Sequence, residues 1–311
     1  MASLSSQWAD ILDVRFRQIY GEELKALPQV GPSIFHQLTS SRNIEKDSSA
    51  SGLSTLIRRS ENQAISYEDE VQGFDVTYTH VNDALGTSVS KQLWEDDQFN
   101  VILRKPSHLA RAKTRTQERM MADVFNYSFT AGGGGLSAFT SGDALALFSS
   151  AHTREDGGAT QSNQTTSDLA EGPIENALVG IRSQLDHKGQ LFMASGDTLI
   201  VPPALEKEAR ILLDSSGRVG TANNDINPYQ GRLKIVVWDF LGSASPGGSD
   251  TAWFVLDSSL HQLNFFNRID RGLEGPEMDF DTSTAKWKVD VRHSVGFSGW
   301  RGTYGSKGDN S

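Results

Sequence analysis

The sequence has no cysteine among its 311 residues, so it offers no disulfide, no thiol nucleophile and no thiolate ligand for a metal. It also lacks any apolar run that approaches the ~20 residues of a membrane-spanning helix. The first residues contain neither a positively charged start nor an apolar stretch of signal-peptide length. These absences predict a soluble protein that is made in the cytoplasm and has no membrane partner.

Positive charge is scarce too. The chain has 29 Lys and Arg against 39 Asp and Glu, which gives a formal net charge of −10. Sequence-specific DNA recognition needs concentrated positive charge, so the composition excludes that class and leaves only weak contact through a local basic patch. Apolar residues are present in sufficient number, at 37% of the chain with 15 Phe and 6 Trp. The chain can therefore fill a core, and wholesale disorder is excluded.

Motifs for catalysis and metal binding are missing as well. No two of the seven histidines lie three or four residues apart, and no Gly-x-Ser-x-Gly elbow occurs. The run Gly132 to Gly135 is not followed by Gly-Lys-Ser/Thr, so it predicts a hinge or domain boundary rather than a phosphate loop.

Two clusters suggest chemistry, and each has a plainer explanation. His152 follows a pair of serines, but neighbours in a loop are far more often structural than catalytic. Glu277, Asp279 and Asp281 alternate, so they could serve as metal or acid–base ligands on one strand face, although a solvated edge is favoured. We predict no catalytic residue, no cofactor and no metal. A soluble metal-dependent enzyme using carboxylates 277–281 is the less favoured alternative.

The most informative stretch is a β-type segment that leads into a long helix. Apolar and polar residues alternate from Phe74 to Leu93, which is the period of a strand with two different faces. The period then changes to spacings of three and four. Pro106 suits the first turn of a helix from Ser107 to Tyr127, about 30 Å long at ~1.5 Å per residue. The residues expected on its apolar face are Leu109, Ala112, Thr116, Met120, Val124 and Tyr127.

The β-type segment is predicted to form a projecting hairpin. Three acids followed by Gly73 suit a hairpin tip in water, with Asn82-Asp83 as a rival turn. The predicted tip comprises Glu68, Asp69, Glu70, Val71, Gln72 and Gly73. A ribbon of this kind has little core of its own, so we expect something outside the subunit to cover it.

A basic stripe is predicted along the long helix, at spacings of four, three, four and four. Its members are Arg104, His108, Arg111, Arg115 and Arg119. The favoured interpretation is a solvated face, paired with the acids at 95–97 or with a neighbouring subunit. The alternative is a surface turned towards packaged nucleic acid.

The remaining chain has a mixed α+β pattern without internal repeats. Residues 7–27 have an amphipathic helical pattern, and the polar residues 39–60 predict an arm or linker. A second module begins near Asp168. A helix follows Pro173, and strands are expected at 198–201, 233–238, 253–256 and, with renewed alternation, 285–295. The final GSKGDNS predicts a disordered tail.

Six stretches, taken in order, resemble the major head (capsid) subunit of Mu-like phages and prophages. They cover most of the chain after residue 60, and the ordered set is more specific than any single stretch. The stretches are SYEDEVQGF (66–74), SKQLWEDDQF (90–99), GDALALFSSAH (142–152), LIVPPALEKEARILL (199–213), GTANNDIN (220–227) and DFDTSTAKWKVDVRHSVGFSGWRGTYGS (279–306).

The resemblance implies the Hong Kong-ninety-seven-type capsid fold, which is α+β. It implies an N-terminal arm at 1–60, an extended E-loop hairpin at 61–93, and the spine helix of a peripheral (P) domain at 94–131. An axial (A) domain would occupy 132–275, and residues 276–311 would supply the return strand of the P domain and the tail. In this layout the strand from Trp287 to Val295 lies beside the continuation of the ribbon.

The implied function is structural. Such subunits assemble with themselves, as hexamers and pentamers, into an icosahedral head that encloses double-stranded DNA, so the protein is expected in the virion after synthesis in the host cytoplasm. Expected partners are weakly held DNA and separate scaffold, portal and decoration proteins. The sequence has no lysine between Lys46 and Lys91, so the tip of the hairpin lacks the nucleophile of an isopeptide bond and the shell is expected to be non-covalent. An encapsulin-type nanocompartment with the same fold is the alternative.

Overall fold

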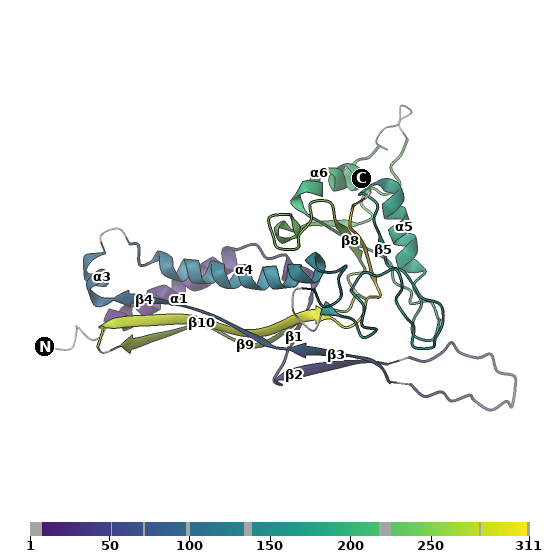
Figure 1. The fold of residues 1–311 in the computed structure, drawn as a ribbon, viewed down its shortest axis with the longest axis horizontal. Helices are drawn as coiled ribbons and strands as arrows, with labels where there is room; N and C mark the ends of the chain where they lie inside the picture. Colours follow the sequence, from purple (N-terminus) through teal and green to yellow (C-terminus); the bar gives the residue numbers. More distant parts are fainter. Residues whose placement is uncertain are drawn as a thin grey trace.

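The structure is a computed structural model, and it describes residues 8–50, 52–70, 72–97, 100–133, 139–217, 225–279 and 281–309. A long four-stranded sheet forms one end of the elongated molecule, and a five-stranded module forms the other (Figure 1). A two-stranded ribbon lies beneath the module in this view, and the segment that connects its two strands projects past the module. None of the helices in these ranges combines the length and the apolar character that crossing a membrane requires.

The long sheet is built around β9 (Leu263–Asp279) and β10 (Thr284–Phe297), which pair antiparallel. β1 (His36–Thr39) adds to β9 in parallel, and β4 (Val81–Ser90) pairs antiparallel with β10, giving the order β1-β9-β10-β4. Along β10, Ala285, Trp287 and Val289 are buried, whereas the lysines between them are exposed. This confirms the predicted strand at 287–295 and its place beside β4, the continuation of the ribbon.

Two helices cover the apolar face of this sheet. α4 (Arg104–Asn126) is the predicted long helix, and Pro106 lies in its first turn. Its buried face is rotated from the expected one, because α4 packs against both the sheet and the second covering helix, α1 (Trp8–Ala26). The buried residues of α4 are Pro106, Leu109, Ala110, Thr114, Glu118, Met121, Ala122, Val124 and Phe125. The short α3 (Lys91–Asp96) links β4 to α4, and Ser90 caps it by accepting a hydrogen bond from the Leu93 N–H.

The N-terminal part of the chain differs from the expected arm at 1–60. α1 (Trp8–Ala26) packs against α4 and β9. The Phe16 ring lies 4.6 Å from the Trp287 ring, and Arg17 donates hydrogen bonds to the carbonyl groups of Leu273 and Gly275. The amphipathic pattern of 7–27 therefore closes the core over the long sheet. The short α2 (Gly31–Ile34) follows and leads into β1.

The five-stranded module has the order β5-β11-β8-β6-β7. Two short 3₁₀ turns accompany it, at Pro203–Leu205 and Asp239–Leu241. Its strands and helices are β5 (Gln164–Thr165), α5 (Glu171–Arg182), β6 (Thr198–Val201), α6 (Glu206–Asp214), β7 (Lys234–Val237), β8 (Trp253–Leu256) and β11 (Thr303–Ser306).

The chain crosses between the two units at places that differ from the expected boundaries. β9 already belongs to the long sheet, so the module ends near residue 262 rather than 275. After β10 the chain returns, and β11 pairs with both β5 and β8. Gly305 and Ser306 are therefore ordered by a sheet, in contrast to the disordered tail that their composition predicts. Of the predicted hinge, Gly134 and Gly135 lie outside the described residues.

A shared core joins the two units. The Phe125 ring near the end of α4 lies within 6.0 Å of the rings of Phe35, Trp238 and Phe254. The buried Glu118 carboxylate accepts hydrogen bonds from the Gly31 N–H and from the Trp238 indole N–H. Burial raises the pKa of Glu118, and the two N–H donors partly oppose this rise. The contacts fix α4 to the module.

The ribbon consists of β2 (Ile44–Ala50) and β3 (Gln72–Thr79), which pair antiparallel. We name residues 52–70, which connect these strands, the ribbon loop. The loop turns at Ser60–Gln63, where the Gln63 N–H donates to the Ser60 carbonyl and Asn62 has a φ of 64°. Residues 44–50 of the polar stretch 39–60, expected to be an arm or linker, thus form a strand, because their backbone groups pair with β3. The tip accordingly lies some residues before the predicted Glu68–Gly73.

Candidate functional site

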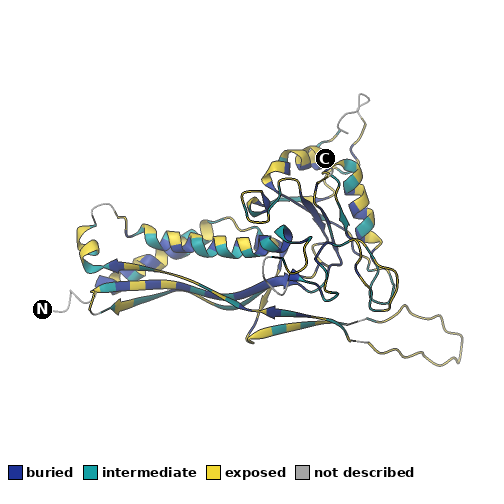
Figure 2. Cartoon of the chain, viewed as in Figure 1, coloured by how far each residue is buried: buried dark blue, intermediate teal, exposed yellow. Residues whose placement is uncertain are grey.

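The ribbon loop presents apolar side chains to solvent. Leu56 is fully exposed, and Tyr67 is 90% exposed. Figure 2 shows the loop as an exposed extension beyond the body of the subunit. Several large, exposed apolar side chains within one short segment are typical of an interaction site. The large apolar residues of the loop, each more than half exposed, are Leu53, Leu56, Ile57, Ile65 and Tyr67.

The residues predicted as the hairpin tip occupy the returning arm of the loop and the start of β3. Glu68 accepts hydrogen bonds from the Ser54 N–H and hydroxyl, both at 2.9 Å, and so joins the two arms. Asp69 and Glu70 are exposed, and Val71 lies outside the described residues. Gln72 and Gly73 belong to β3.

The basic stripe lies on the exposed face of α4. Arg104, His108, Arg111, Arg115 and Arg119 are all exposed. Arg111 Nε lies 2.6 Å from Glu23 Oε1 on α1, and Arg119 Nε lies 4.0 Å from Asp123 Oδ2. Within the described ranges, the side chains of Arg104 and Arg115 form neither a hydrogen bond nor an ion pair. The stripe is therefore a surface with partly uncompensated positive charge on an acidic protein.

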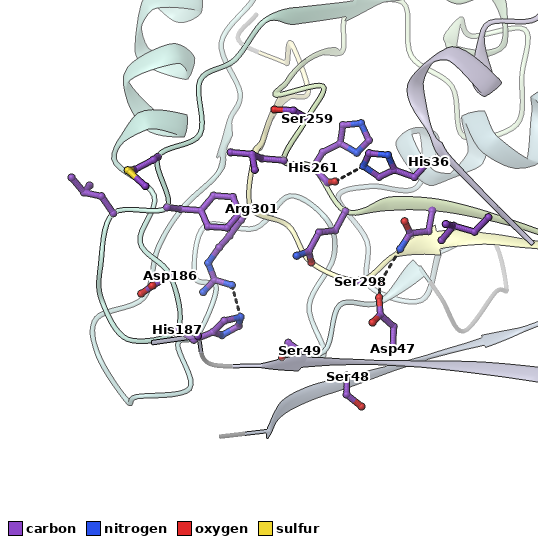
Figure 3. Close-up of a pocket in the computed structure, with 18 residues that line it drawn as sticks. His36, Asp47, Ser48, Ser49, Asp186, His187, Ser259, His261, Ser298 and Arg301 are labelled. Atoms are coloured by element: carbon purple, nitrogen blue, oxygen red, sulfur yellow. Dashed lines mark hydrogen bonds between the residues drawn. The ribbon is translucent and has the colours of Figure 1, made fainter. Parts of the chain in front are cut away.

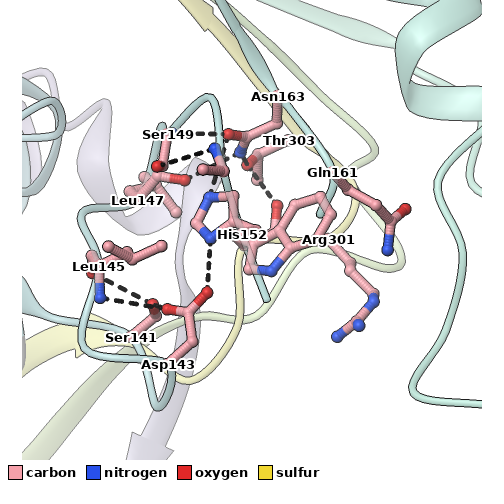
Figure 4. A network of polar contacts seen from close by, with 12 residues as sticks. Ser141, Asp143, Leu145, Leu147, Ser149, His152, Gln161, Asn163, Arg301 and Thr303 are labelled. Carbon is pink, nitrogen blue, oxygen red and sulfur yellow. Dashed lines mark hydrogen bonds and ion pairs between the residues drawn. The ribbon is translucent and has the colours of Figure 1, made fainter. Parts of the chain in front are cut away.

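His152 is the centre of a buried polar network (Figure 4). Its Nδ1 lies 2.8 Å from Asp143 Oδ2 and its Nε2 3.2 Å from Asn163 Oδ1, while its ring stacks on Trp300 at 4.3 Å. Burial alone would raise the pKa of Asp143, but hydrogen bonds from His152 and from Ser141 outweigh it and lower the pKa. Both ring nitrogens are thus occupied by residues other than the neighbouring serines, which favours a structural role.

Asn163 extends this network to the five-stranded sheet. Its amide donates to the Leu147 carbonyl and to the Thr303 hydroxyl of β11, and its carbonyl accepts from the Ser149 N–H. The network therefore pins the irregular segment before β5 to the sheet.

The carboxylates at 277–281 do not converge. Asp279 pairs with Lys286 at 3.1 Å across the β9–β10 turn, while Glu277 and Asp281 are exposed. Across the part of the chain that the structure describes, no three His, Asp or Glu side chains are grouped so that they could hold a metal. The arrangement is that of a solvated sheet end.

A groove of about 840 Å³ lies where the ribbon meets the five-stranded module (Figure 3). His36 Nε2 lies 2.9 Å from the His261 carbonyl oxygen, and the two rings stack at 4.4 Å. Burial, together with the neighbouring His36, lowers the pKa of His261 to about 4, so His261 is neutral at pH 7. Arg301 and His187 lie on the module side of the groove, and Asp47 and Ser49 lie on the ribbon side.

The sequence interpretation missed the apolar loop residues and the contacts at the base of the ribbon. The apolar cluster at 53–57, inside an otherwise polar stretch, was the signal that could have revealed the loop surface. These contacts are made by Glu155 to Phe74 of β3 and by Lys188 to Glu68 of the ribbon loop, and the partners are far apart along the chain. No local pattern marks them.

Comparison with known proteins identifies the family to which this chain belongs. The sequence profile of the phage capsid protein family matches residues 75–306, which is most of the chain. No curated protein sequence matches.

Solved structures share the fold at low sequence identity. The capsid of cyanophage P-SCSP1u is 13% identical, with 91% of this chain and 89% of that chain covered and a TM-score of 0.58. The capsid of bacteriophage JBD30, decorated with minor capsid protein trimers, is 12% identical, with coverages of 70% and 92% and a TM-score of 0.53. A virus-like particle from Pyrococcus furiosus is 8% identical, with coverages of 94% and 98% and a TM-score of 0.52.

These likenesses show the Hong Kong-ninety-seven-type fold, and the virus-like particle shows that fold alone does not separate phage heads from other shells. The family match over residues 75–306 is to phage capsid proteins, and so favours a phage head over another kind of shell. It assigns a structural, non-enzymatic role in the virion capsid. The chain belongs to the phage capsid protein family and is a major capsid protein.

Proposed function

We propose that this subunit builds the icosahedral head of a Mu-like phage or prophage around double-stranded DNA, by packing with itself as hexamers and pentamers. The observation that carries the proposal is the ribbon loop, whose apolar side chains its own subunit leaves exposed. A neighbouring copy would cover them through a heterologous contact that closes into rings. The six ordered sequence stretches support the Mu-like subtype.

The parts of the subunit take the following roles in this proposal. β2, β3 and the ribbon loop form the E-loop, and the long sheet with α1 and α4 forms the P domain. The five-stranded module forms the A domain. A separate scaffold protein, a portal protein and decoration proteins complete the list of partners, and the decorated JBD30 capsid supports the last of these. Contacts between subunits are non-covalent, because the ribbon loop contains no lysine.

Assembly itself is the direct test. Purified subunit is expected to form rings, tubes or shells as its concentration rises, because mass action over many copies makes modest contacts sufficient. Light scattering and negative-stain electron microscopy on the same samples report this. A strictly monomeric protein at high concentration, with and without scaffold, would contradict the proposal.

The basic stripe extends the proposal to DNA. Arg104, His108, Arg111, Arg115 and Arg119 would face the lumen and hold the genome weakly and without sequence preference, through phosphate contacts. All five side chains are exposed, and Arg104 and Arg115 have no side-chain partner among the described residues; both observations support this orientation.

Arg111→Gln combined with Arg115→Gln is expected to leave empty shells normal and to reduce the yield of DNA-filled particles several-fold. For DNA binding, the slope of log affinity against log salt concentration should fall by about 2, or one for each lost phosphate contact. Gradient sedimentation separates empty from filled particles. Arg182→Gln with Arg210→Gln, both exposed on helices of the module, is the matched control. Normal filling by the stripe variant would show a merely solvated face, and failed assembly would show an inter-subunit contact.

A further inference from the structure

A tight turn of the five-stranded module faces the ribbon. Leu185 and Leu191 form an antiparallel bridge at its base. Inside the turn, the Asp186 carboxylate accepts hydrogen bonds from the Lys188 N–H at 2.9 Å and the Gln190 N–H at 2.8 Å. Gly189 has a φ of +78°, which glycine adopts without strain. The turn is therefore closed by its own hydrogen bonds and presents two successive side chains, His187 and Lys188.

The base of this turn is fixed to the body of the module. Gln161 exchanges hydrogen bonds with both backbone groups of Leu185, accepting at 2.7 Å and donating at 3.2 Å. Arg301 Nε donates to the same Leu185 carbonyl at 2.7 Å, and the Arg301 side chain is almost fully buried. Since β11 begins at Thr303, two residues after Arg301, these hydrogen bonds anchor the turn to the sheet.

Lys188 reaches from this turn to the ribbon loop. Its Nζ lies 2.6 Å from Glu68 Oε1, and the lysine side chain is only 17% exposed. The same Glu68 carboxylate accepts from the N–H and hydroxyl of Ser54 on the opposite arm. The Lys188 and Ser54 hydrogen bonds lower the pKa of Glu68 to about 2, so the carboxylate stays charged well into acid. One carboxylate thus joins both arms of the loop and connects them to the module.

A second carboxylate makes the same kind of contact where β2 and β3 adjoin the ribbon loop. Glu155 Oε1 accepts from the Ser49 hydroxyl on β2 and from the Phe74 N–H on β3, both at 2.9 Å. His187 Nδ1 lies 3.2 Å from the same oxygen. Gly73 permits this approach, because a Cβ at that position would collide with the Glu155 carboxylate. Adjacent residues of one turn therefore meet two carboxylates, and each carboxylate touches both sides of the ribbon.

We propose that Glu68, Lys188 and Glu155 are positioning residues that fix the direction of the ribbon loop before another subunit binds it. The inference rests on the proposed function, in which the loop is the inter-subunit contact. A loop that is ordered in its bound direction loses less conformational freedom on binding, so association is faster and tighter than for a free loop. All of these contacts lie within one subunit.

The structural alternative is a surface ion pair without consequence for assembly. Exposed pairs contribute little to global stability, so unfolding experiments cannot distinguish the two. The dynamics of the loop in the unassembled subunit and the rate of assembly do distinguish them.

The test compares Lys188→Met with Lys188→Arg, which keeps the charge and a donor. In unassembled protein, hydrogen exchange at the Ser54 amide, which donates to Glu68, is expected to be about fivefold faster in Lys188→Met. The rate of assembly, followed by light scattering at a fixed concentration, should fall severalfold. Lys188→Arg should stay close to the parent in both measurements. Lys207→Met, which removes an exposed lysine of α6, is the matched control.

Exchange at the level of the parent in Lys188→Met would overturn the positioning role, because the loop would then be held by other contacts. Faster exchange with an unchanged or higher assembly rate would overturn it as well, by showing that the preset direction does not assist binding. If the parent forms no assemblies while exchange depends on Lys188 as expected, the proposed function fails and the intramolecular contact stands. Glu68→Gln, which loses the charge on the other partner, should reproduce the exchange and assembly results of Lys188→Met.

Discussion

Replacing residues 55–66 of the ribbon loop with a short Gly-Ser linker is expected to abolish shell formation and leave the subunit folded. The replacement removes Leu56, Ile57 and Ile65, which are exposed in the free subunit. Covering such a side chain is worth about 1.5–3 kcal/mol, and the contact recurs in every copy of the shell. Ser54 and Glu68 stay in place, so the hydrogen bond that joins the two arms of the loop is retained. Circular dichroism and electron microscopy on one preparation measure folding and assembly together.

A second variant separates loop length from apolar contact. Leu56→Ser with Ile57→Ser keeps the length and the turn at Ser60–Gln63, and should weaken assembly nearly as much as the replacement. Shells as robust as those of the parent, from either variant, would show that the loop does not clamp a neighbour. Loss of cooperative unfolding in the replacement variant would show instead that the ribbon is part of the subunit's own core.

Trp287→Ala is expected to cost about 3–5 kcal/mol of unfolding free energy, the range for truncating a buried large aromatic side chain. Trp287 is 1% exposed, packs against Phe16 at 4.6 Å, and donates its indole N–H to Asp13 at 3.1 Å. The substitution leaves a cavity between α1 and the long sheet, and it also removes a partner of Asp13. Urea denaturation followed by circular dichroism gives the free energy.

Lys288→Ala on the opposite face of β10 is the control for this variant. Lys288 pairs with Glu274 at 3.4 Å and is 56% exposed, so its loss should cost less than about 1 kcal/mol. A cost of that small size for Trp287→Ala would mean that α1 is not docked on the sheet. The assignment of α1 to the P domain rather than to a free arm would then be wrong.

Elements with a strong period were predictable from the sequence. α4 follows from its apolar spacing and from Pro106 in the first turn, and β10 follows from the alternation of apolar residues with lysines. In both elements one face packs against the rest of the subunit, so buried positions recur with the period of the helix or strand and are visible in the sequence. The direction of the buried face of α4 was not predictable, because Glu118 is held inside by the Gly31 and Trp238 N–H groups.

β2 shows why the ribbon was placed incorrectly. Its sequence, IEKDSSA, has no apolar alternation, since the strand is part of a two-stranded ribbon with little to bury. Backbone hydrogen bonds to β3 specify it, and any residue except proline can supply these. Without β2, the acidic residues after Tyr67 were the nearest turn signal. The same difficulty applies to Glu155 and Lys188, whose partners lie 81 and 120 residues away along the chain.

β11 has a consequence for how the subunit is made. The strand lies between β5 and β8 in the five-stranded sheet, yet it is formed by Thr303–Ser306, after the whole long sheet has been synthesised. A nascent chain that has passed β8 therefore still has an open edge in that sheet. Contacts this distant in sequence form late, so the module matures only after translation has passed residue 306. Chains that stop earlier lack the strand between β5 and β8, so they cannot complete the sheet.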